Sequence, residues 1–73
     1  MLDIVERDKL DNIFTYHSPK GDQHERYTVI RNTAKAFAML IIDKCPVSRE
    51  RSLAITHLEE CVMWANSSIA RNE

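Results

Sequence analysis

Two stretches of the sequence decide the fold: residues 22–44, DQHERYTVIRNTAKAFAMLIIDK, and residues 48–71, SRERSLAITHLEECVMWANSSIAR. Each stretch repeats apolar residues at the spacing of one face of a helix. Only Cys45-Pro46-Val47 connects them, where Pro46 ends the first helix and Ser48 can cap the second. A connection this short favours two long helices packed as an antiparallel hairpin.

These two helices carry more apolar surface than a lone hairpin can cover. The stripe of the first helix consists of Tyr27, Ile30, Ala34, Phe37, Ala38 and Ile41. The stripe of the second consists of Ala54, Ile55, Leu58, Cys61, Val62, Ala65 and Ile69, and beside it runs a ridge of Leu53, His57 and Trp64. A hairpin uses the two stripes, so the ridge is left to cover either the N-terminal segment or another chain. Because a chain of 73 residues builds only a small core, we expect a homo-oligomer.

The N-terminal part is predicted to hold a short helix and an irregular segment. Residues 1–13 place apolar residues at rough helical spacing among charges, and residues 14–21, FTYHSPKG, form an extended strip that ends in a turn. Asp22 and Glu25 fit the reciprocal pattern that caps a helix start. The prediction is therefore a single all-α domain over residues 1–73, a short helix followed by the hairpin.

Composition excludes several classes of partner. Ten Lys and Arg against eleven Asp and Glu give a net charge of −1, which provides no field for duplex nucleic acid or a membrane surface. The start is acidic, and no apolar run is long enough to span a bilayer. Cys45 and Cys61 lie far apart and outside any metal-binding pattern. We expect a soluble cytoplasmic protein with two reduced thiols.

The residues that usually carry catalysis or bind metals form no recognisable set. Glu59 and Glu60 are adjacent and project about 100° apart on a helix, which does not suit a cooperating pair. His57 and Glu60 have the spacing of half a metal site in a helical bundle, but also that of two polar residues beside a core. The sequence predicts no enzyme, no catalytic residue, no metal and no cofactor.

Two residues outside these patterns are candidates for binding. Tyr16 lies in the irregular strip, where its ring is free to stack on a base, or else works with Phe14 to anchor the N-terminal segment to the hairpin. Arg31 lies one helical turn after Tyr27, and its position alone predicts a surface arginine. Thr33 and Arg71 show no pattern of their own.

A resemblance adds to this interpretation. The motifs that carry it are Phe14-x-Tyr16-His17-x-Pro19-x-Gly21-x-Gln23, Tyr27-x-x-Ile30-Arg31, Cys45-Pro46-x-Ser48-x-Glu50-x-Ser52-x-Ala54 and Leu58-Glu59-Glu60-x-x-Met63-Trp64-Ala65-Asn66-x-x-Ile69-Ala70-Arg71-Asn72. Over residues 12–73 the chain resembles the anti-CBASS cyclic-oligonucleotide sponges, the helical-hairpin proteins of tailed bacteriophages. Such sponges are helical oligomers, typically hexamers, that sequester the cyclic nucleotide signals of bacterial CBASS immunity without degrading them.

The resemblance implies two kinds of site. Tyr16 corresponds to a tyrosine that stacks on a base of a cyclic dinucleotide, and Arg31 corresponds to a basic residue at its phosphate. Thr33 and Arg71 correspond to residues of a separate pocket for cyclic trinucleotides. Some members carry lysine in place of Arg31, which keeps the charge and changes the hydrogen-bond geometry.

The function that the resemblance implies is sequestration in the cytoplasm of an infected bacterium. The expected ligands are dinucleotides of the cyclic GMP-AMP type and trinucleotides of the cyclic tri-adenylate type, and sequestration keeps them from activating an effector. The alternative from another class is a structural or adaptor hairpin, with Tyr16 and Arg31 as packing residues and the apolar ridge against an unrelated protein.

Overall fold

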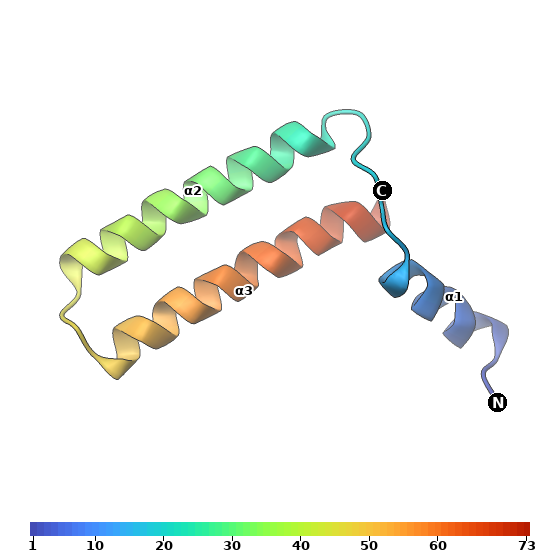
Figure 1. Ribbon diagram of the computed structural model, residues 1–73, viewed down its shortest axis with the longest axis horizontal. Coiled ribbons are helices and arrows are strands. Elements are labelled where there is room, and N and C mark those ends of the chain that lie inside the picture. The colour runs from blue at the N-terminus through green and yellow to red at the C-terminus, as the bar shows by residue number, and fades with distance from the viewer.

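The computed structural model describes residues 1–73 and contains three helices and no strand (Figure 1). Helix α1 spans Ile4–Phe14, α2 spans Gln23–Lys44 and α3 spans Arg49–Asn72. Helices α2 and α3 lie side by side and run in opposite directions, while α1 lies beyond the C-terminal end of α3. The prediction of an all-α chain with a short N-terminal helix and a long antiparallel hairpin is confirmed.

Polar side chains set the helix starts, in one case differently from the prediction. Asp3 and Ser48 accept hydrogen bonds from the amides of Glu6 and Arg51, at 2.7 and 3.1 Å, and so cap α1 and α3. The predicted cap of α2 is wrong, because the side chain of Asp22 accepts no bond from a helix amide. The backbone of Asp22 is not extended, since its ψ is near 11°. Its carboxylate instead accepts a hydrogen bond from Arg26 Nε.

The tip of the hairpin is closed by a side chain of α3. Arg51 Nη1 donates to the carbonyl oxygens of Ile42 and Cys45, at 3.3 and 3.2 Å. The last carbonyls of a helix lack partners within that helix, and a cation near them also suits the helix dipole. Arg51 therefore caps the C-terminal end of α2 and links it to the first turn of α3.

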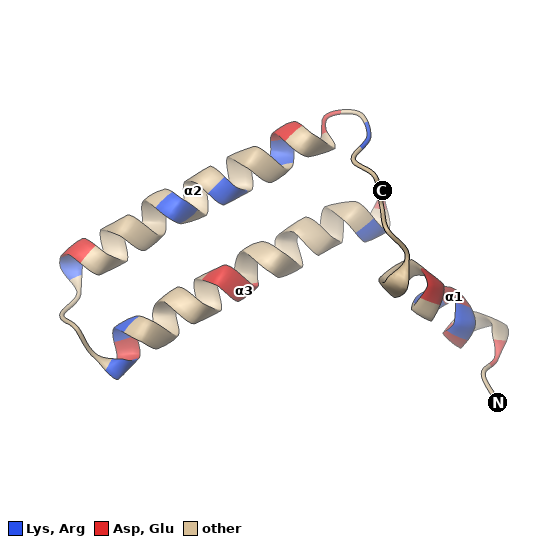
Figure 2. Ribbon diagram, in the orientation of Figure 1, with Lys and Arg blue, Asp and Glu red and all other residues tan.

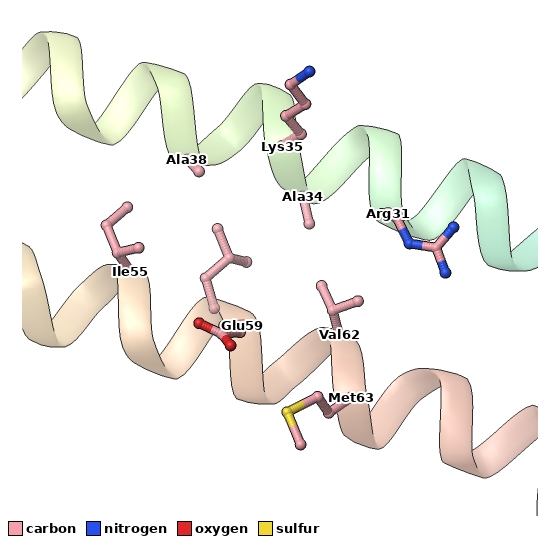
Figure 3. Close-up of a pocket in the computed structure, with 9 residues that line it drawn as sticks. Arg31, Ala34, Lys35, Ala38, Ile55, Glu59, Val62 and Met63 are labelled. Atoms are coloured by element: carbon pink, nitrogen blue, oxygen red, sulfur yellow. The ribbon is translucent and has the colours of Figure 1, made fainter.

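The contact between α2 and α3 is narrow. Ala34 and Ala38 of α2 face Ile55 and Val62 of α3 across the gap between the helices (Figure 3). No apolar side chain in the chain is buried, and the molecule is flat, with extents of 49, 33 and 13 Å. The hairpin thus has a seam of contact and two open faces in place of a core.

The N-terminal segment does not cover the spare ridge of α3. Trp64 remains 65% exposed, and α1 lies beyond the end of the hairpin (Figure 1). Phe14 and Tyr16, at 81% and 82% exposed, do not anchor the segment either. Of the two partners expected for the ridge, the chain's own N-terminal segment is therefore excluded.

Candidate functional site

Arg31 lies at the edge of an apolar groove between α2 and α3 (Figure 3). The lining residues are Arg31, Ala34, Lys35, Ala38, Ile55, Leu58, Glu59, Val62 and Met63. Lys35 points away from α3, so Arg31 is the cation of this groove that reaches toward the gap. The groove has a volume of about 270 Å³, which is smaller than the roughly 300–1,000 Å³ of most small-molecule sites. One chain therefore forms a small, open groove on this face.

The guanidinium of Arg31 has no partner within the chain. It forms no ion pair and no hydrogen bond, although the carboxylate of Glu59 lines the same groove. An arginine presents five N–H donors in a planar fork that matches the oxygens of a phosphate. This position can therefore bind an anion without first breaking an ion pair.

Thr33 lines a second groove, on the other side of the contact formed by Ala34, Leu58 and Val62. The remaining residues of this groove are Val29, Ile30, Phe37, Cys61 and Ala65, and the volume is about 390 Å³. Thr33 is its only polar side chain apart from the thiol of Cys61. The structure therefore places Arg31 and Thr33 in different grooves.

Tyr16 lies outside both grooves, in the extended strip that leads from α1 to α2. The preceding helix ends at Phe14, and the backbone of the next residue, Thr15, is extended, with φ −103° and ψ 137°. Nε2 of the neighbouring His17 donates to the carbonyl oxygen of Asn12 at 2.8 Å. The ring of Tyr16 is thereby presented to solvent at the open end of the hairpin.

Arg71 lies in the last turn of α3, close to the end of α1. Its carbonyl oxygen accepts a hydrogen bond from Asn12 Nδ2 at 3.1 Å, which ties α1 to α3. Arg71 is half-buried as a residue, and its guanidinium forms no ion pair within the chain and lines neither groove. A single chain therefore places Arg31 and Thr33 in different grooves, and Tyr16 and Arg71 outside both grooves, near Asn12 at the open end of the hairpin.

The sequence analysis missed the polar cluster at the open end of the hairpin, which we call the end network: Asp22, Gln23, Arg26 and Glu73. Arg26 binds both carboxylate oxygens of Glu73, with Nη1 at 2.7 Å from Oε2, and its Nε donates to Asp22. Gln23 is the only buried residue in the chain and donates to Glu73 at 3.3 Å. Arg26 and Glu73 are 47 residues apart, so no local pattern could have revealed the pair.

The end network shifts the protonation of its charged members. Hydrogen bonds from Arg26 and Gln23 lower the pKa of Glu73 from 4.5 to about 2. The hydrogen bond to Glu73 raises the pKa of Arg26 further above its usual value. Both side chains remain about two-fifths exposed, so solvent weakens the pair. The network therefore fixes the geometry of this end more than it adds stability.

The second half of α3, between Glu60 and Arg71, carries no charged residue (Figure 2). His57 Nδ1 lies 3.5 Å from Glu60 Oε2, and no group of three or more His, Cys, Asp or Glu residues is arranged to hold a metal ion. No helix is both long and apolar enough to cross a membrane.

Comparison with families of known proteins gives one match. Residues 6–70, most of the chain, match the family described as Acb2/Tad1, hairpin domain. No curated protein and no solved structure matches the chain.

Proposed function

The chain belongs to the Acb2/Tad1 hairpin family of anti-CBASS sponges, and from this membership we propose that it binds cyclic di- and trinucleotides and holds them without cleaving them. The observation that carries the proposal is the unpaired guanidinium of Arg31 at the edge of an apolar groove. A phosphate can meet this guanidinium through two parallel hydrogen bonds, while the apolar wall excludes water. In an infected bacterium, the signal held in this way would not reach its effector.

In the dinucleotide site, Arg31 binds a phosphate and Tyr16 stacks on a base. An aromatic ring contributes about 1–3 kcal/mol per stacked base and tolerates every base. With a net charge of −1, the chain must capture a small anion locally, because it has no broad basic surface. A few repeated arginines in an oligomer meet this need.

Two subunits complete each dinucleotide pocket. Tyr16 and Arg31 lie at different places in one chain, and the groove beside Arg31 is small and open. A second subunit that brings its own strip to the groove would supply both the missing wall and the stacking ring. We propose a homo-oligomer, a hexamer as the family resemblance implies, with Thr33 and Arg71 in the separate trinucleotide pockets.

The test is capture followed by recovery of the ligand. The purified protein is titrated with a panel of cyclic di- and trinucleotides in a calorimeter, then denatured, and the released ligand is analysed by chromatography. We expect binding, and a ligand that returns intact after a long incubation. Linear products that increase with protein and time would make the protein a nuclease.

Absence of binding to the whole panel would favour the alternative, an adaptor hairpin. The specific observation behind this alternative is the exposed Trp64 on a face that no part of the chain covers.

The Arg31→Ala variant tests the proposed phosphate contact, and Lys35→Ala is its matched control. Lys35→Ala removes a cation one helical turn away, whose side chain points out of the gap between the helices.

A further inference from the structure

The strip that carries Tyr16 is held at two points only. At its start, His17 donates to the carbonyl oxygen of Asn12, and Asn12 donates to the carbonyl oxygen of Arg71. At its end, the amide of Lys20 donates to Gln23 Oε1 at 3.1 Å, and the amide of Gln23 donates to the carbonyl oxygen of Lys20 at 3.1 Å. Pro19 has no amide hydrogen, and no other backbone hydrogen bond holds residues 16–20.

Gln23 is the anchor at the second point. Its side chain is 3% exposed, in a molecule where every apolar side chain is at least partly open to solvent. Burial of an amide is costly unless its oxygen and nitrogen both find partners. Here the oxygen accepts from Lys20 and the nitrogen donates to Glu73, so one side chain joins the strip to the end of α3.

The end network holds Glu73, the residue to which the side-chain nitrogen of Gln23 donates. Glu73 is bound by both terminal nitrogens of Arg26, and Arg26 is also bound to Asp22 in the first turn of α2. Gly21, at φ +58°, turns the chain from the strip into α2 without the penalty that a side chain would bring. The strip is therefore bonded to a hydrogen-bonded junction between the start of α2 and the end of α3.

We propose that Gln23 is a positioning residue for the cyclic-dinucleotide site, which it serves by holding the strip so that the ring of Tyr16 is already in place before the ligand arrives. The inference rests on the proposed function, because it assumes that Tyr16 stacks on the ligand. A ring on a fixed strip binds without the entropy cost of ordering its backbone. Gln23 itself does not touch the ligand.

Gln23→Ala tests this role with two measurements on the full chain. Hydrogen exchange followed by NMR should show the amide of Lys20 exchanging about tenfold faster, because its acceptor is gone, while amides inside α2 and α3 keep their protection. Calorimetry with cyclic GMP-AMP should show binding weakened by about tenfold. Light scattering should show the oligomer mass of the parent.

The control removes another amide side chain from the same end of the molecule. Asn72 donates only to the carbonyl oxygen of Ser68, within α3. We expect Asn72→Ala to leave both the Lys20 exchange rate and the cyclic GMP-AMP affinity unchanged. A loss in this variant equal to that in Gln23→Ala would overturn the specific role of Gln23.

A reciprocal exchange of side chains should restore the anchor. In Gln23→Glu/Glu73→Gln, the carboxylate at position 23 can accept from Lys20, from the amide at position 73 and from Arg26, three residues further along α2. We expect Lys20 exchange and cyclic GMP-AMP affinity to return to within about threefold of the parent. Failure of this double variant with preserved oligomer mass would overturn the proposed hydrogen-bond chain.

Two results separate this inference from the proposed function. If the parent binds cyclic GMP-AMP and Gln23→Ala binds it equally well, the positioning role is overturned and the proposed function stands. If the parent binds no cyclic dinucleotide, the proposed function is overturned and the positioning role with it, whatever the exchange rates show.

Discussion

The guanidinium of Arg31 and the ring of Tyr16 are both available for binding, but they lie in different parts of the chain. Arg31 borders a groove between the two long helices, and Tyr16 lies on the strip at the open end of the hairpin. Neither residue is used by the fold, since Arg31 has no ion-pair partner and Tyr16 is largely exposed. Substitution of either should therefore change binding without disturbing the structure.

Tyr16→Ala and Arg31→Ala should each weaken capture of a cyclic dinucleotide by about one to two orders of magnitude. Stacking contributes about 1–3 kcal/mol per base, and a hydrogen bond to a charged group about 1.5–3 kcal/mol. Calorimetry with cyclic GMP-AMP measures the loss, and light scattering checks that the oligomer persists. Normal binding by both variants would remove these residues from the site.

Thr33→Ala/Arg71→Ala should abolish binding of cyclic trinucleotides and leave dinucleotides unaffected. The physical reason is that Thr33 lines the groove on the other side of the helix contact from Arg31. Arg71→Ala changes only the side chain, so the backbone carbonyl oxygen at this position can still accept the hydrogen bond from Asn12. Saturation with one ligand should leave the affinity for the other nearly unchanged, as calorimetric titration can measure. Mutual displacement would instead indicate one shared pocket.

At the scale of elements, the open end of the hairpin depends on one carboxylate. Glu73 directly follows α3 and contacts Arg26 and Gln23, so it joins the end of α3 to the first turn of α2 and, through Gln23, to the strip. The tip is held differently, by Arg51 on the last carbonyls of α2. The junction at the open end therefore depends on a carboxylate that titrates in acid, whereas the Arg51 contacts at the tip involve no carboxylate.

The contribution of Glu73 to stability should disappear at low pH. Because its pKa is lowered from 4.5 to about 2 on folding, the interaction stabilises the folded chain fully above pH 4.5. It is lost as the pH falls through that interval, and below about pH 2 the carboxylate is protonated in both states. Thermal unfolding of the parent and of Glu73→Gln should therefore show a difference in Tm near neutral pH that shrinks below about pH 4. A constant difference across this range would show that the charge of Glu73 is not what stabilises the junction.

At the scale of the whole molecule, a single chain is more open than a compact monomer of its size. Its accessible surface is 6100 Å², whereas a compact monomer of this mass exposes about 4,700 Å². Its radius of gyration is 16.3 Å, against about 11 Å for a compact chain of this length. The excess surface of about 1,400 Å² exceeds the roughly 800 Å² that each partner buries in a standard interface.

We therefore expect a homo-oligomer whose mass by light scattering is several times that of the monomer. Val62 lines both grooves, and a carboxylate buried there without a partner costs several kcal/mol. Val62→Asp should dissociate or unfold the assembly, whereas Thr56→Ala, an exposed change on the same helix, should not. A parent that elutes as a clean monomer at micromolar concentration would remove the basis for pockets between subunits.

The helices and their antiparallel pairing could be predicted from the sequence. These features depend on neighbours along the chain: apolar residues at helical spacing, and Pro46 and Ser48 at the connection. Contacts between distant segments were needed to show that Gln23 is buried and that Glu73 holds the junction. The tertiary structure also decided that Tyr16 lies away from the groove of Arg31. Such contacts could not be inferred from the sequence, because their energy depends on how segments almost 50 residues apart meet in space.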